Sequence, residues 1–195
     1  MNSIEDQKLK VIVLTAKELF WKHGFKRVSI EEVCREAKVS KMTFYKHFKN
    51  KSELVKYIIN HFTDKAMDQY NAIMQSNIPF PEKIQKTIDL KLEQSKDLSN
   101  EFFNDYVRHA DKEMLELLHH KRTELLGTII NDYTEAQKKG DIRKDVKPEF
   151  ILYFLNQMQE MVKDEQLEKL YDSPKDIIME FTKFFFYGIL PRDKS

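Results

Sequence analysis

The sequence predicts an all-α protein, and three observations support this fold class. The 195 residues include only 4 Gly and 5 Pro, too few for the many tight turns of an all-β sandwich or barrel. Apolar residues recur at helical spacing in the segments between the turn signals. With 14 Phe and 8 Tyr in a chain that is 41% hydrophobic and 33% charged, there is enough apolar bulk for a folded core.

The first two helices are marked by a helix end and a helix start. A helix is expected over residues 6–23, because Gly24 suits the left-handed conformation that ends a helix. Ser29 and Glu32 then have the spacing of a capping box, in which each side chain satisfies an amide at a helix start. The helix that follows is short, and its apolar residues are Ile30, Val33, Cys34 and Ala37.

The next two helices also have recognisable starts. Ser40 can cap a third, short helix over residues 41–48. Asn50 and Glu53 form a second box-like pair at the start of a long helix over residues 51–74.

Two prolines, Pro79 and Pro81, break the pattern after this long helix. Further helical patterns cover residues 82–96, 98–109, 112–138, 148–165 and 174–190. The expected organisation is a three-helix N-terminal domain over residues 1–50 and a larger helical bundle over residues 51–195, with helix 51–74 linking the two.

Charge is distributed unevenly along the chain, although the formal net charge is only +1. Residues 1–62 hold 13 Lys and Arg against 7 Asp and Glu, or +6, whereas residues 63–195 hold 20 against 25, or −5. Such asymmetry indicates that one end of the chain meets a polyanion, or that it carries a solvated basic surface.

Residues 29–48 have the features of a helix-turn-helix: a capped short helix, a tight turn and a second short helix. Phe44 and Phe48, four residues apart, would anchor the second helix inward. Its other face presents cations, hydroxyls and an aromatic ring, namely Lys41, Met42, Thr43, Tyr45, Lys46 and His47. These groups suit the major groove of DNA. A solvated helix of an ordinary bundle explains fewer of these features.

A pattern of aromatic, glycine and basic positions runs through residues 9–58. It reads Phe20-x3-Gly24-Phe25-x3-Ser29-Ile30, then Ala37-Lys38-Val39-Ser40-Lys41-x-Thr43-Phe44-Tyr45-x-His47-Phe48-x2-Lys51-x2-Leu54. This pattern resembles the DNA-binding domain of the TetR family of transcriptional regulators. The resemblance implies a cytoplasmic homodimer, usually a repressor, that binds a palindromic operator in double-stranded DNA. A small molecule bound in the C-terminal helical domain, residues 51–195, would release the DNA.

The resemblance also implies roles for individual residues. Tyr45 and Lys51 match positions that hold phosphates, and Ser29 matches a hydroxyl residue that contacts the DNA backbone. Five residues fall at positions that face the groove: Lys41, Met42, Thr43, Lys46 and His47. Lys38 occupies a turn position where the family commonly has Gly, so its backbone must tolerate that conformation. Met42, where the family often has a small residue, either contacts a thymine methyl or packs on the domain.

Two late segments, residues 150–161 and 177–190, are apolar on nearly all sides, so they must be buried almost all round. In the family, the last two long helices of each subunit form a four-helix dimer interface; a monomeric core is the alternative interpretation. The interface residues expected here are Phe150, Phe154, Met158, Ile178, Phe181 and Phe185.

The resemblance also implies a ligand cavity between helices of the second half, for an unknown effector that is apolar or amphipathic. The side chains expected to line it are Phe102, Phe103, Tyr106, Met114, Leu118, Tyr133, Tyr153 and Gln157. Further polar candidates are Asn104, His109 and Asn156. The same apolar residues at helical spacing are also typical of an ordinary core.

Other kinds of site find little support in the sequence. The single cysteine, Cys34, cannot form an intramolecular disulfide and is expected to be a buried thiol. His119 and His120 are adjacent, so on a helix they point about 100° apart and do not predict a metal site. No Gly-rich phosphate loop or nucleophile elbow occurs, and neither a cofactor nor an enzymatic activity is expected.

The N-terminus lacks the basic and apolar regions of a signal peptide, and the longest apolar run, residues 184–190, is too short to span a bilayer. A cytoplasmic DNA-binding regulator without membrane contact is therefore expected. Two alternatives are a regulator controlled by abundance or a protein partner rather than a ligand, and a small-molecule carrier or enzyme that retains a vestigial DNA-binding domain.

Overall fold

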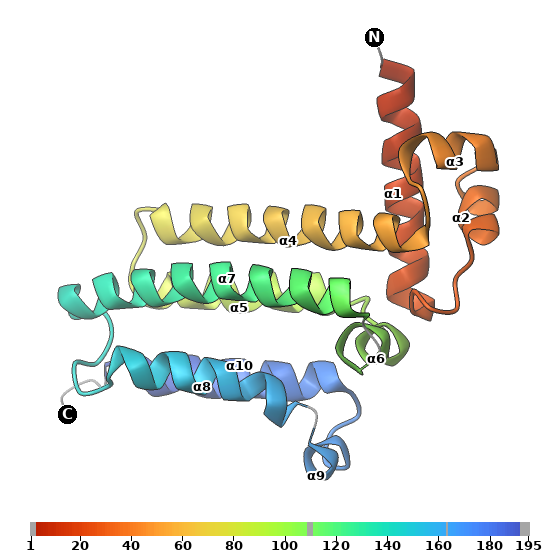
Figure 1. Ribbon diagram of the computed structural model, residues 1–195. Coiled ribbons are helices and arrows are strands. Elements are labelled where there is room, and N and C mark those ends of the chain that lie inside the picture. Colours follow the sequence, from red (N-terminus) through yellow and green to blue (C-terminus); the bar gives the residue numbers. More distant parts are fainter. Residues whose placement is uncertain (1–2, 109–110, 163, 192–195) are drawn as a thin grey trace. The chain divides into compact units, whose positions relative to one another are not determined.

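The computed structural model describes residues 3–108, 111–162 and 164–191, which form helices joined by short connections (Figure 1). No strand occurs among these residues, so the all-α prediction is confirmed. In chain order the helices are α1 (Ser3–His23), α2 (Ile30–Glu36), α3 (Lys41–His47), α4 (Lys51–Gln75), α5 (Phe80–Ser95), α6 (Asn100–Arg108), α7 (Lys112–Lys139), α8 (Pro148–Met161), α9 (Glu165–Glu168) and α10 (Pro174–Ile189).

The helices group into two compact units. Unit 1 comprises Met1–Lys65 and Asp97–Leu117, and unit 2 comprises Ala66–Lys96 and Leu118–Ser195. The predicted boundary at residue 50 does not coincide with this division. The first part of α4, the whole of α6 and the start of α7 pack with α1, α2 and α3, because their apolar residues complete the core of unit 1.

Unit 1 is built on a core of fully buried side chains. Ile12 and Phe20 of α1 lie within it, as do Phe44 of α3 and Leu54 and Ile58 of α4. Trp21 packs against Phe102 of α6, with ring centroids 4.4 Å apart. A backbone hydrogen bond joins the same two parts of the chain, because the amide of Ser99, just before α6, donates to the carbonyl of Trp21 at 2.9 Å.

In unit 2, the core consists of aromatic and branched side chains from α5, α7, α8 and α10. Tyr133 of α7 lies among Phe80, Phe185 and Phe186, at ring-centroid distances of 6.5, 6.1 and 6.3 Å. Thr182 of α10, at 3% exposure, donates its hydroxyl to the carbonyl of Ile178 and so adds no unsatisfied group to this core.

One predicted helix is wrong in its extent. A single helix was expected over residues 148–165, but α8 ends at Met161 and a short helix, α9, begins at Glu165. The reason is local, because the carboxylate of Asp164 accepts from the amides of Gln166 and Leu167 and so starts a new helix.

None of the described helices is both long and apolar enough to cross a membrane.

The two units change the interpretation of the charge asymmetry. Residues 1–65 hold 14 Lys and Arg against 8 Asp and Glu, which is +6, but residues 97–117 of the same unit hold 2 against 6, which is −4. Of the net charge of −5 on residues 63–195, −4 therefore belongs to the unit that carries the helix-turn-helix.

Candidate nucleic-acid interface

The two helices of the motif begin at capping serines, as predicted. The Ser29 hydroxyl accepts from the amide of Glu32 at 3.1 Å, and the Ser40 hydroxyl accepts from the amide of Thr43 at 3.1 Å. Each bond satisfies an amide that the helix itself leaves unpaired. The sequence therefore fixes where α2 and α3 start.

The turn between α2 and α3 contains Lys38 at φ = 53°. The amide of Lys38 donates to the carbonyl of Arg35, and the amide of Val39 donates to the carbonyl of Cys34. These are the two bonds of a Schellman motif, which needs a left-handed residue at this place. The prediction that a lysine tolerates the turn position commonly held by Gly is confirmed.

The inward face of α3 is anchored as the sequence indicated. Phe44 is fully buried, Phe48 is 3% exposed, and their ring centroids lie 5.8 Å apart. Phe48 also meets Tyr57 of α4 edge to face at 5.4 Å. This packing fixes the rotation of α3, and hence the side chains that it presents outward.

The outward face of α3 holds the side chains predicted to meet DNA. Lys41 and Lys46 are exposed, Met42 is 71% exposed and Tyr45 is 53% exposed. The exposure of Met42 favours contact with a partner over packing on the domain. Thr43 and His47 are half-buried, and the hydroxyls of Thr43 and Ser40 lie 3.0 Å apart.

Lys41 is held by an acidic neighbour on α2. Its Nζ forms an ion pair with the Glu31 carboxylate, in which both side chains remain exposed. Hydrogen bonding to Lys41 lowers the pKa of Glu31, and the same bond raises the pKa of Lys41. Both groups are therefore charged at neutral pH, and a phosphate must compete with Glu31 for this ammonium.

Lys51 makes a different set of contacts from the other predicted cations. Its Nζ donates to the carbonyls of Lys26 and Val28 at 2.9 and 3.0 Å, in the loop between α1 and α2. Burial lowers the pKa of Lys51, and the charge of Asp105 opposes that shift. The structure thus places Lys51 as a support of the loop, with only its third N–H left for a phosphate.

Asp105 of α6 is a residue that sequence reasoning missed. It is 8% exposed, and its Oδ2 accepts from the amide of Lys26 at 2.8 Å. The two residues are 79 positions apart, so no local pattern could have joined them.

The side chains predicted to line a ligand cavity are divided between the two units. Phe102, Phe103 and Met114 belong to unit 1, where Phe102 and Met114 are buried. In unit 2, Leu118 is half-buried and Tyr133 is buried in the aromatic core, whereas Tyr153 and Gln157 are exposed. The side chain of Tyr106 and the whole of His109 lie outside the described residues.

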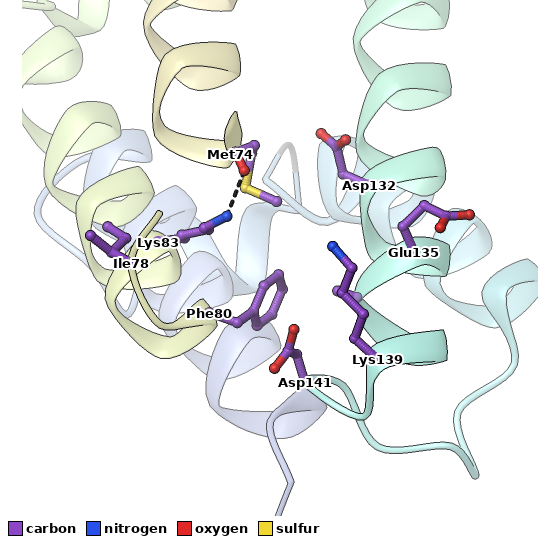
Figure 2. Close-up of a pocket in the computed structure, with 9 residues that line it drawn as sticks. Met74, Ile78, Phe80, Lys83, Asp132, Glu135, Lys139 and Asp141 are labelled. Carbon is purple, nitrogen blue, oxygen red and sulfur yellow. Dashed lines mark hydrogen bonds between the residues drawn. The ribbon is translucent and has the colours of Figure 1, made fainter. Parts of the chain in front are cut away.

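A small pocket does occur in unit 2, but none of the predicted residues lines it. It has a volume of about 120 Å³ and opens near the ends of α4 and α7 (Figure 2). Its charged lining residues are Lys83, Lys139, Asp132, Glu135 and Asp141, and Lys83 Nζ donates to the Met74 carbonyl at 2.6 Å. This volume is below the roughly 300 Å³ at which pockets for drug-sized ligands begin.

The side chains predicted for a dimer interface behave in two ways. Phe150 of α8 is 59% exposed, but Met158 and Phe185 are buried within unit 2. Phe154, Ile178 and Phe181 are half-buried, and Phe154 stacks on Phe185 at 5.6 Å. Tyr153, Phe184 and Tyr187 are exposed instead. Because α10 is apolar on nearly all sides, its sequence period did not single out Phe184 and Tyr187.

The remaining expectations concern Cys34 and the histidine pair. Cys34 is 4% exposed, and burial raises the pKa of its thiol, as expected for a structural cysteine. His119 and His120 are both exposed. Within the described part of the chain, no group of three or more His, Cys, Asp or Glu side chains could hold a metal ion.

Comparison with known proteins agrees with this geometry. Residues 12–58 match the family model of the bacterial regulatory proteins of the tetR family. The uncharacterized HTH-type regulator YuxN of Bacillus subtilis is 37% identical over 60 residues, which are 31% of this chain but only 21% of YuxN. YhgD, another uncharacterized HTH-type regulator of B. subtilis, is 25% identical over 148 residues, 75% of this chain and 77% of YhgD.

Solved structures share the fold over nearly the whole chain. SmeT, the repressor of the Stenotrophomonas maltophilia multidrug efflux pump SmeDEF, superposes with a TM-score of 0.67 at 16% identity, over 94% of this chain and 91% of SmeT. The capped helices, the turn at Lys38 and the matched residues 12–58 lead to one conclusion. Residues 12–58 are a domain of the tetR family of bacterial regulatory proteins, and the chain as a whole has the fold of solved regulators of that family.

Proposed function

We propose that this protein is a homodimeric repressor whose two α3 helices bind a palindromic operator and whose C-terminal helices bind the effector that releases it. The observation that carries the proposal is the outward face of α3, where exposed cations, Met42 and the Tyr45 hydroxyl are held by a buried aromatic anchor. Such a face suits base edges and phosphates better than any apolar partner. No enzymatic step is proposed, and the expected location is the cytoplasm.

An exposed apolar stripe on α8 and α10 supports the dimer. Phe150 and Tyr153 of α8 and Phe184 and Tyr187 of α10 are between 59% and 72% exposed. Aromatic side chains gathered on two helices in this way are typical of a protein interface. A twofold axis would place two α3 helices on successive turns of the major groove, roughly 34–36 Å apart.

Selection of duplexes from a random library tests DNA binding directly, with affinities measured by fluorescence anisotropy at several salt concentrations. We expect enrichment of a palindrome and a binding constant that falls steeply with salt. Tyr45→Phe should weaken all duplexes alike, because the hydroxyl contacts phosphate. Changes at Thr43 or Lys46 should alter which duplex is preferred. No enrichment over random sequence would reject the proposal.

The effector is tested separately by thermal melts against a panel of apolar and amphipathic compounds. A compound that binds the native state raises the melting temperature by mass action, and a true effector also weakens operator binding. Melting shifts without any change in DNA affinity would favour a carrier. Operator binding unaffected by every compound would favour a regulator controlled by abundance or by a protein partner. A reporter gene placed behind the selected operator distinguishes repression from activation.

A further inference from the structure

We propose that Asp105 of α6 is a positioning residue for DNA recognition, because its carboxylate fixes the loop that leads into the helix-turn-helix. This loop, residues 24–28, connects α1 to the Ser29 cap of α2. The proposal rests on the DNA-binding function proposed above, and it requires no effector.

The loop is clamped by two charged side chains from distant parts of the sequence. Asp105 Oδ2 accepts from the amide of Lys26 at 2.8 Å. Lys51 Nζ donates to two carbonyls of the loop, those of Lys26 and Val28. Asp105 and Lys51 thus hold both backbone polar groups of Lys26, its N–H and its C=O, and hydrogen bonds to carboxylate and ammonium groups are stronger than those between neutral groups. All three elements belong to unit 1.

The close approach of α6 to the loop depends on Gly24. This residue has φ = 75°, and a Cβ added to it would lie 2.6 Å from Asp105 Oδ2 and 3.3 Å from the backbone of Glu101. A side chain at position 24 would therefore displace the carboxylate as well as strain the backbone. The glycine that ends α1 also makes room for the Asp105 contact.

The Asp105 carboxylate is buried, and its neighbours stabilise it there. It is 8% exposed, and a buried carboxylate is costly unless it accepts hydrogen bonds or meets a positive charge. Here the amide of Lys26 supplies the bond, and the nearby Lys51 ammonium supplies the charge. Other contacts seat the same helix, since Trp21 and Phe25 both pack on Phe102.

The contact of Asp105 with the loop affects DNA binding because the loop sets the orientation of α2 and α3. Val28 at the end of the loop is fully buried, and the next residue caps α2, which packs against α3. A loop released from Asp105 lets α2 and α3 adopt a wider range of orientations. Base contacts need one orientation, whereas non-specific phosphate contacts tolerate several.

The test compares Asp105→Ala, Asp105→Asn and a matched control, Glu101→Ala, in the full chain. Glu101 is an exposed acid on the same helix, one turn earlier, so the control removes the same charge. We expect Asp105→Ala to weaken binding of the selected palindrome about 10-fold, the effect of leaving the part-buried Lys26 amide without its acceptor. Asp105→Asn keeps an acceptor oxygen and should stay within about threefold of wild type, and every variant should bind random duplex within about twofold of wild type.

Equal operator affinity of Asp105→Ala and Glu101→Ala would overturn the proposal, as would equal losses for the Ala and Asn variants or an equal loss on random duplex. If Asp105→Ala does not fold, amide hydrogen exchange decides. The Lys26 amide should be protected in wild type and in Asp105→Asn, and unprotected exchange in wild type would reject the contact. A wild-type protein that enriches no duplex would instead reject the proposed DNA-binding function itself.

Discussion

Two regions of this protein are rich in aromatic side chains, and they use them in opposite ways. At α3, Phe44 and Phe48 are buried by the chain itself, so that polar and charged groups face outward. On α10, Phe185 and Phe186 are buried, but Phe184 is 72% exposed and Tyr187 is 64% exposed. A cationic face is complemented by a polyanion and an apolar face by another apolar surface, so the two regions call for different partners.

The largest expected effect tests the inward side of α3. Phe44→Ala should lower the free energy of unfolding by about 3–5 kcal/mol, because the ring is fully buried and the cavity cannot fill. Trp21, the single tryptophan, packs in unit 1 and reports its unfolding by fluorescence in a urea titration. Met42→Ala on the exposed side of the same helix should change stability by no more than about 0.5 kcal/mol. Similar midpoints for the two variants would contradict the assignment of faces.

The outward side of α10 is tested by Phe184→Glu. A charge at the centre of an apolar interface should raise the dimer dissociation constant at least about 100-fold, and sedimentation velocity would show a monomer. Leu170→Glu is the control, because Leu170 is 73% exposed but lies outside the α8 and α10 stripe. If both variants remain dimeric, the stripe is not the interface. If neither the variants nor the wild type dimerise, the proposed homodimer itself is wrong.

The same contrast explains what the sequence could predict. Around α3 the decisive interactions are local, such as the caps at Ser29 and Ser40 and the turn at Lys38. The caps were predicted from neighbouring residues, and the conformation of Lys38 was implied by the family resemblance. The contact of Asp105 with Lys26 spans 79 residues, and that of Lys51 with Lys26 spans 25. Such contacts depend on how helices pack, which no pattern within one segment encodes.

In unit 2 the buried and exposed side chains could not be predicted for a different reason. Where nearly every side of α10 is apolar, the period that normally marks the buried face disappears. Phe185 was therefore assigned to an interface although it lies in the core, and Phe184 was left out. On other helices, the side chains expected to line a cavity included both buried Tyr133 of α7 and exposed Tyr153 of α8.

A smaller effect would sharpen the description of the turn before α3. Lys38→Gly should stabilise unit 1 by about 1 kcal/mol, because glycine adopts the left-handed conformation without a steric penalty. The same substitution at Lys46, inside α3, should destabilise by about 1 kcal/mol. Urea titrations followed by Trp21 fluorescence measure both. Equal signs for the two glycines would show that Lys38 is not strained in this turn.

The smallest effect concerns the charged face of α3 itself. Glu31→Gln removes the carboxylate that holds Lys41, so the ammonium becomes free to meet a phosphate. We expect operator binding to tighten about two- to threefold at low salt and the unfolding midpoint to stay unchanged, since exposed ion pairs contribute little. Glu36→Gln removes an equal charge from α2 without touching Lys41, because Glu36 pairs with Arg35.

The difference between these two variants isolates the release of Lys41 from the general gain in positive charge. Because Lys41 lowers the pKa of Glu31, the carboxylate stays ionised through the ordinary carboxyl range and competes with DNA at neutral pH. Wild type should therefore approach Glu31→Gln only when the pH falls below the ordinary carboxyl pKa, where Glu31 becomes protonated. Equal gains for Glu31→Gln and Glu36→Gln at neutral pH would mean that Lys41 makes no contact with DNA.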